Sequence, residues 1–180
     1  MKSKFYLITL FLSLVLVDGI AQSVVRGPYI QLNTPNSIII RWRTSSATDS
    51  KVWYGNSYLN LTSISSLGGN RTEHEVQITG LTPNTTYYYA IGNSGGQLAG
   101  ADPDHFFKTS PPHGTSQPVS IWVLGDAGKI SVEQRAVRDG FYSYNGGPSA
   151  DLILLLGDNA YDDGTDEEYQ GAYFENMYES

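Results

Sequence analysis

The chain has 180 residues, no cysteine and a formal net charge of −7, from 11 basic and 18 acidic residues. This length fits one ordinary domain or two small ones, and without cysteine the fold must rely on an apolar core or on bound metal instead of disulfides. No Lys or Arg follows Arg138, whereas half of the acids lie in the last thirty residues. This charge distribution excludes nucleic-acid binding through phosphate contacts by that segment.

The first 21 residues have the pattern of a secretory signal peptide. Lys2 and Lys4 precede the apolar stretch Phe5–Val17, and Gly19 and Ala21 provide small residues for cleavage after Ala21. The apolar stretch is 13 residues long, whereas a membrane-spanning helix needs about 20. We therefore expect a cleaved leader and a secreted or periplasmic mature protein without a membrane anchor.

Residues 22–110 predict a small antiparallel β-sandwich. Gly-, Pro- and Asn-containing turns separate short segments rich in β-branched and aromatic residues. These segments are Ser37–Arg43, Lys51–Gly55, His74–Ile78, Tyr87–Tyr89 and Phe106–Thr109. The stretch Gly80–Tyr89 resembles the corner of fibronectin type III domains, in which a tyrosine bonds back to the backbone. Residues 111–118, rich in turn formers, predict a linker.

Residues 119–180 change to alternating strands and helices. The continuously apolar runs Val119–Leu124 and Leu152–Leu156 predict buried parallel strands. A capping box at Ser131 and Gln134 predicts a helix over Val132–Tyr142.

A second capping box, at Thr165 and Glu168, predicts a helix that continues to the end of the chain. Leu152–Leu156 is apolar on both faces and therefore needs elements that pack on both sides of the sheet. Only two parallel strands occur in the sequence, so part of this packing is missing. We expect residues 119–180 to be the beginning of a larger α/β domain, incomplete in this chain.

Two aspartates stand just beyond the predicted parallel strands. Asp126 follows Gly125, and Asp158 follows Gly157, 32 residues later. This spacing matches one strand–helix–strand unit, so both carboxylates should meet at the carboxyl edge of the sheet. Carboxylate oxygens suit hard metal ions. A Gly-Asp pair after a strand is also typical of a helix-capping turn, and each motif alone allows that interpretation.

Two further residues accompany the aspartates. Gly128 would let backbone approach the site closely. Tyr161 follows Asp158 by three residues, and a strongly charged ion could hold its phenol as phenolate near neutral pH. Packing alone also explains a tyrosine in a loop. Together, Asp126, Asp158 and Tyr161 predict a metal site.

The ordered combination Asp126-x-Gly128 and Gly157-Asp158-x-x-Tyr161 resembles the first two sequence blocks of the purple acid phosphatases, which belong to the calcineurin-like metallophosphoesterases. The upstream segments Arg26–Gln31 and Val52–Gly55 are similar to the fibronectin-like N-terminal domain of that family. The resemblance therefore implies a sandwich at 22–110, and the first strand–helix–strand–helix of the metallophosphoesterase domain, truncated, at 119–180.

The resemblance also implies roles for the three site residues. Asp126 would bind a ferric ion, Asp158 would bridge it to a second ion of iron, zinc or manganese, and Tyr161 would bind the ferric ion as phenolate. The substrate would be a phosphomonoester, either a small molecule or a phosphoprotein. The family's later histidine blocks have no counterpart, because His74, His105 and His113 all precede Asp126. We therefore assign no catalytic residue, because the resemblance places the proton donor in those later blocks.

These observations predict an exported, metal-dependent phosphatase with acid phosphatase activity at a binuclear metal centre, present as an N-terminal fragment that is inactive alone. A non-catalytic, exported β-sandwich that acts as an interaction module is one alternative. A related phosphodiesterase or nucleotidase is another, because the substrate-contacting loops are not in the sequence.

Overall fold

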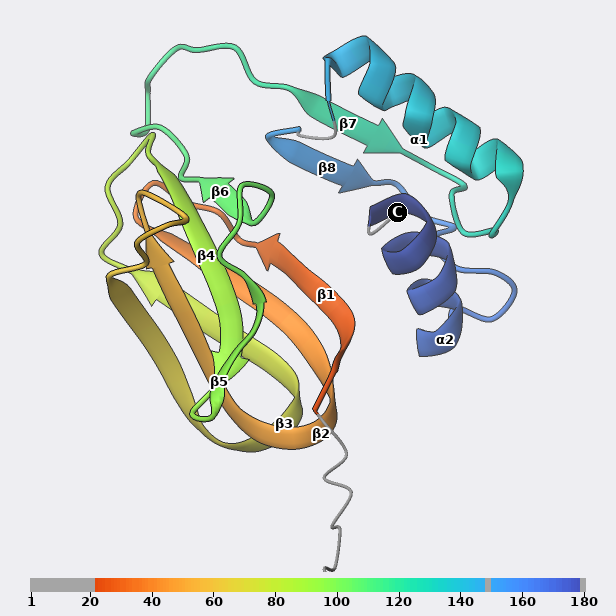
Figure 1. Cartoon of the computed structure of the whole chain (residues 1–180). Coiled ribbons are helices and arrows are strands. Elements are labelled where there is room, and N and C mark those ends of the chain that lie inside the picture. Colours follow the sequence, from red (N-terminus) through yellow and green to blue (C-terminus); the bar gives the residue numbers. More distant parts are fainter. Residues whose placement is uncertain (1–21, 148–149, 179–180) are drawn as a thin grey trace, which may run out of the picture.

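The computed structural model describes residues 22–147 and 150–178. The predicted signal peptide lies outside the described residues. Figure 1 shows a β-sandwich followed by a smaller unit of strands and helices, whose C-terminal helix lies beside the sandwich. No helix within the described ranges combines the length and the apolar character needed to cross a membrane.

The sandwich contains six strands. They are β1 (Val24–Gln31), β2 (Ser37–Gly55), β3 (Ser63–Thr79), β4 (Thr86–Asn93), β5 (Gly96–Gly100) and β6 (Phe106–Lys108). Strand β2 takes part in both layers. Its first half pairs antiparallel with β1 and β3, and its second half pairs with β3 and β4. Strand β4 also pairs with β5 and β6.

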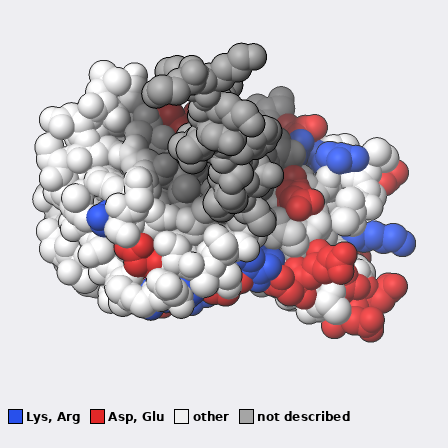
Figure 2. All heavy atoms as spheres, turned by 60° about the horizontal axis from the view of Figure 1, so that its bottom comes forward, with Lys and Arg blue, Asp and Glu red and all other residues white. Residues whose placement is uncertain are grey.

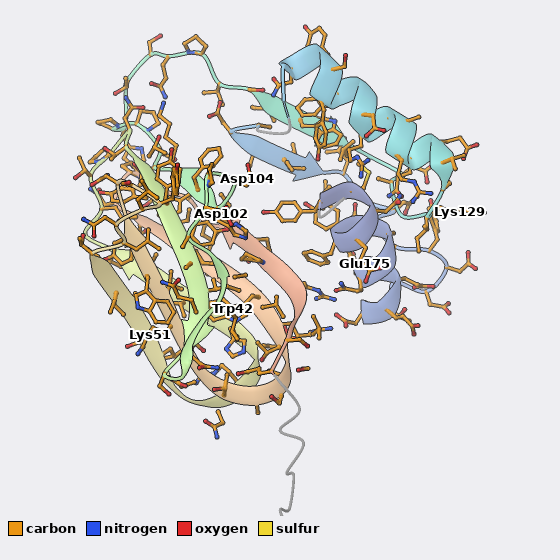
Figure 3. All side chains as sticks on the ribbon, in the orientation of Figure 1. Trp42, Lys51, Asp102, Asp104, Lys129 and Glu175 are labelled. Carbon is orange, nitrogen blue, oxygen red and sulfur yellow. The ribbon has the colours of Figure 1, made fainter. Side chains whose placement is uncertain are left out.

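Alternating residues of these strands form the main core. Its buried members, each at most 4% exposed, are Ile38, Ile40, Trp42, Val52, Val76, Ile78, Leu81, Tyr89, Ile91 and Phe107. Figure 3 shows Trp42 within the sandwich. Period-two alternation in β2 places every second side chain inside, which explains why the sequence predicted strand structure there.

The predicted all-β character of this region is confirmed, with two differences. Ser37–Arg43 and Lys51–Gly55, predicted as separate strands, belong to one long strand, because β3 pairs with β2 on both sides of a bulged region. Strands β1 and β5 were not predicted, since β1 contains Gly27 and Pro28 and β5 is rich in glycine. The predicted tyrosine corner is confirmed: the Tyr87 hydroxyl accepts a hydrogen bond from the backbone N of Thr82 at 3.1 Å.

The second unit consists of β7 (Ile121–Leu124), α1 (Val132–Asn145), β8 (Leu152–Leu155), α2 (Asp166–Tyr169) and the π-helix η1 (Gln170–Tyr178). Strands β7 and β8 pair in parallel, as predicted, from Ile121 opposite Leu152 to Leu124 opposite Leu155. Helix α1 packs on one face of this pair, where the rings of Trp122 and Phe141 stack with centroids 4.2 Å apart.

The other face of the β7–β8 pair is open, so the prediction of fully buried strands is wrong for this structure. Ile121 and Val123 are each 50% exposed, and Leu152 and Leu154 are 49% and 45% exposed. The apolar run predicts burial on both faces because parallel strands usually have two covering layers. Among the described residues, one layer is present.

Both predicted helix starts are found, but their capping differs. The Ser131 hydroxyl accepts from the backbone N of Gln134 at 3.1 Å, yet the Gln134 side chain turns away, so the reciprocal bond of a capping box is not made. At Thr165 and Glu168 the complete capping box is present. The helix that follows is α-helical for one turn only and continues as η1.

Candidate metal centre

Two loops meet at the carboxyl edge of the β7–β8 pair. The first follows β7 and carries Asp126, and the second follows β8 and carries Asp158. Backbone hydrogen bonds join them: the Asp126 N donates to Gly157 O at 3.1 Å, and the Tyr161 N donates to Gly128 O at 3.0 Å. The two loops therefore continue the pairing of the parallel strands beyond their ends.

Gly128 is the point of closest approach between the loops. A Cβ built there would lie 2.4 Å from the backbone N of Ala160 and 2.6 Å from the backbone O of Asp158. No side chain larger than hydrogen fits without moving backbone. The sequence-based prediction that Gly128 permits close approach is thus confirmed, and the backbone it admits belongs to the Asp158 loop.

The three predicted ligand residues come together in space. The Tyr161 hydroxyl donates to Asp126 Oδ1 at 2.6 Å and to Asp158 Oδ2 at 2.8 Å. The hydrogen bond to Asp126, followed by that to Asp158, raises the pKa of Tyr161 above its ordinary value. The phenol therefore keeps its proton between the two carboxylates. Tyr161 is 37% exposed, so the cluster is open to solvent.

Both aspartates have left-handed backbone conformations, with φ of 57° at Asp126 and 53° at Asp158. Such conformations are uncommon for residues other than glycine, although Asp tolerates them better than most. Strain of this kind concentrates at functional sites, where the surrounding structure maintains it. Leu32, Asn84 and Ala101 of the sandwich have similar φ values, so the conformation alone does not mark the site, but it fixes the direction in which each carboxylate leaves its loop.

Gln134 supports the first loop, a role that the capping-box prediction missed. Its side chain is 8% exposed and donates to the carbonyls of Ala127 at 2.5 Å and Ala172 at 2.9 Å. It also accepts from the amide of Asn176. This amide therefore ties the Asp126 loop to η1. Polar residues buried in a helix face usually have such partners, but the sequence gives no signal of which ones.

The donor set has the chemistry of a hard-cation site. Two carboxylates and a phenol present only oxygen, which is the preference of hard ions. Neighbouring oxygens around an octahedral ion with bonds of about 2.0–2.1 Å lie about 2.9 Å apart. The Tyr161 oxygen lies 2.6 and 2.8 Å from the two carboxylate oxygens, which are ordinary O–H···O hydrogen-bond distances. The side-chain oxygen of Asn159, in the same loop, is buried without a hydrogen-bond partner.

The site lacks histidine. In the part of the chain that the structure describes, no group of three or more His, Cys, Asp or Glu side chains is arranged for a metal. His74 lies inside the sandwich, where its ring bonds to Thr44 Oγ1 at 2.7 Å and Ser50 Oγ at 2.8 Å. His105 pairs with Asp102 at 2.8 Å. The three oxygens thus fit an ion but supply only part of a full coordination shell.

An acidic run follows Tyr161 and leads into α2. Asp162, Asp163 and Glu167 are exposed, and Figure 2 shows acidic side chains crowded at one end of the molecule. Glu168 caps α2 instead, and Asp166 pairs with Arg26 and Arg43 of the sandwich.

Fold and site together define a class of protein: a β-sandwich joined to a parallel β–α–β unit with carboxylate and phenol oxygens clustered at its strand ends. Residues 25–109 match the family model described as "Purple acid Phosphatase, N-terminal domain". Residues 25–109 are therefore similar to the N-terminal domain of the purple acid phosphatases, which confirms the resemblance seen in the sequence.

Individual proteins give the same result. The chain is similar to purple acid phosphatase 15 of Arabidopsis thaliana, with 36% identity over 49% of this chain and 15% of the relative. It is also similar to purple acid phosphatase 13 of the same plant, with 31% identity over 68% of this chain and 21% of the relative. The chain thus spans about a fifth or less of the length of these relatives.

Solved structures show the likeness of the fold. The structure of PhoD superposes with a TM-score of 0.60 at 14% identity, covering 87% of this chain and 35% of that chain. A fibronectin type III domain from the human KIAA0970 protein covers 53% of this chain with a TM-score of 0.38. The PhoD superposition extends beyond the sandwich, because it covers far more of the chain than the sandwich occupies.

Proposed function

We propose that this chain supplies part of a binuclear metal centre in an exported phosphatase that hydrolyses phosphomonoesters. The observation that carries the proposal is the convergence of Asp126, Asp158 and Tyr161, with oxygen contacts of 2.6 and 2.8 Å at the strand ends. Similarity to the N-terminal domain of the purple acid phosphatases supports phosphatase chemistry. The export of the protein, its substrate and the later ligands belong to the proposal.

In this proposal, Asp126, Asp158 and Tyr161 would hold the metal ions, a ferric ion together with iron, zinc or manganese. The ions would supply electrostatic stabilisation of a phosphoryl group. The residues of the chain prepare the site for that charge. The proton on Tyr161 Oη, now shared with two carboxylates, would leave when a cation takes its place. The backbone bonds between the loops keep the two aspartates at a fixed separation.

A binding test decides between this proposal and a purely structural site. We would load the full chain with iron, zinc or manganese, determine bound metal by elemental analysis, and assay 4-nitrophenyl phosphate hydrolysis. We expect bound metal in the wild type and its loss in Asp158→Asn, which keeps the size of the side chain and removes the charge. Equal metal content in the two proteins would refute the proposal.

A second candidate function is that of a non-catalytic interaction module. The complete core of the sandwich and the small number of ligands among the described residues favour it. The same experiment separates the two: metal binding that depends on Asp158 would support the metal centre even without turnover, whereas turnover of the aryl phosphate as well would exclude a non-catalytic role for the chain.

A further inference from the structure

Only residues 162–165 separate Tyr161 from the start of helix α2, and hydrogen bonds fix their conformation. The Glu168 carboxylate accepts from the backbone N of Thr165 at 2.8 Å and of Asp163 at 3.2 Å. The Thr165 hydroxyl accepts from the Glu168 N at 3.3 Å. Reciprocal capping of this kind fixes the entry of the chain into the helix. The position of Tyr161 therefore depends on where α2 is held.

The sandwich holds α2 at its first residue, Asp166. Arg43 of β2 binds both carboxylate oxygens of Asp166, at 2.5 and 2.9 Å. Arg26 of β1 donates to the same carboxylate at 3.0 Å. The hydrogen bond from Arg43, then that from Arg26, lowers the pKa of Asp166 to about 2. A bidentate arginine–carboxylate contact restricts the relative orientation of the two groups in addition to the attraction between their charges.

Arg26 continues the contact along the next helical turn. Its side chain is only 8% exposed, its Nε donates to Gln170 Oε1 at 2.6 Å, and its guanidinium lies 4.3 Å from the Phe174 ring centroid. The ring of Tyr29, on the same strand, lies 4.9 Å from that of Phe174. A buried guanidinium that lost these partners would be uncompensated, so Arg26 favours the docked position of the helix.

We infer that Arg26 and Arg43 are positioning residues, through which the sandwich holds the Tyr161 loop against the two aspartates. The sandwich then contributes to the construction of the site without contributing a ligand. The part of this inference that concerns metal rests on the function proposed above, whereas the order of the loop does not. A sequence would not reveal it, because Arg43 and Asp166 are 123 residues apart.

The test uses the full chain with Arg43→Gln, and Arg41→Gln as the matched control. Arg41 lies two residues earlier on β2, on the same face, but pairs with Glu75 of the neighbouring strand instead of α2. Asp166→Asn removes the partner charge while leaving the pairing of Arg43 with Glu73. Two quantities are measured: hydrogen exchange of peptides covering residues 159–170 without metal, and Mn²⁺ affinity by electron paramagnetic resonance titration.

We expect Arg43→Gln and Asp166→Asn each to speed exchange of the loop at least about threefold and to weaken Mn²⁺ binding by a similar factor. The effects should be less than additive in the double variant, because both substitutions remove the Arg43–Asp166 interaction, whereas the contacts of Asp166 with Arg26 and of Arg43 with Glu73 are lost separately. Arg41→Gln should change neither quantity. Unchanged loop exchange in Arg43→Gln, or an equal change in Arg41→Gln, would overturn the positioning role.

Failure of the metal function gives a different result. If the wild type binds no Mn²⁺, or if Asp158→Asn binds it equally well, the proposed metal centre is refuted. The exchange data collected without metal still decide the positioning role. Urea unfolding followed by tryptophan fluorescence, in which Trp42 and Trp53 report the sandwich and Trp122 the second unit, should show little change of the sandwich in Arg43→Gln, because the one sandwich contact it removes is the exposed pair with Glu73. A loss of sandwich stability as large as the change in the loop would instead assign Arg43 a general structural role.

Discussion

Replacing Gly128 by alanine should separate the two loops of the candidate site. The added Cβ would lie 2.4 Å from the backbone N of Ala160, whereas ordinary contact begins at 3.4 Å, so the loops must part by about 1 Å. The neighbouring atoms are backbone and cannot move aside by changing rotamer. Forced overpacking of this kind typically costs about 1–3 kcal/mol.

The hydrogen bond from the Tyr161 N to Gly128 O, now 3.0 Å long, would be stretched past useful length by that separation. Amide exchange at Tyr161 and Asp126 reports the local opening. A cost of 1–3 kcal/mol corresponds to roughly 5- to 150-fold faster exchange by local opening. Because a misplacement of about 1 Å can cost roughly 10²-fold at a well-oriented site, Mn²⁺ binding should weaken as well.

Gly140→Ala is the matched control for Gly128→Ala. Gly140 lies inside α1, and a Cβ there would meet nothing within 4 Å. The same substitution should stabilise that helix by about 0.5–1 kcal/mol. Tyr161 and Asp126 amides that exchange as slowly in Gly128→Ala as in the wild type would refute the steric argument.

Three further predictions concern the sandwich. Burial, and then the nearby charge of Arg71, lowers the pKa of His74 below 6.5. As pH falls, His74 therefore takes up a proton at a higher pH in the unfolded state than in the folded state. The free energy of unfolding should keep its full value above pH 6.5 and decline below it. Urea unfolding at pH 7.5 and 5.0 should show this decline, and His74→Gln should reduce it; an equal decline in both proteins would contradict the assignment. Phe107→Ala, at a side chain 1% exposed, should cost about 3–5 kcal/mol in the same assay, and a cost below 1 kcal/mol would be inconsistent with a core position. Tyr87→Phe, which removes the acceptor for the Thr82 N, should cost about 0.5–1.5 kcal/mol; no measurable loss would mean that water replaces the bond.

Elements whose signals are local were predictable from the sequence. The strands around Ile38–Trp42 and Val76–Ile78, the parallel pair β7–β8 and the start of α1 follow from period, apolar runs and capping residues. The same reasoning misjudged β2, because a bulged strand that serves two layers reads as two strands. It also assigned Gln134 to its own helix end, although that side chain bonds to Ala127 and Ala172.

The candidate site also combines features that local sequence signals predict with features that depend on tertiary contacts. By itself, the sequence determined which residues stand at the strand ends: Asp126, Asp158 and Tyr161 follow from apolar runs, glycine turns and spacing. Only the tertiary structure decided that their oxygens meet within 2.8 Å, that Gly128 admits the opposite loop, and that Arg26 and Arg43 of the sandwich hold α2. Strand ends are set by local patterns, whereas contacts between residues more than a hundred positions apart depend on how the two units pack.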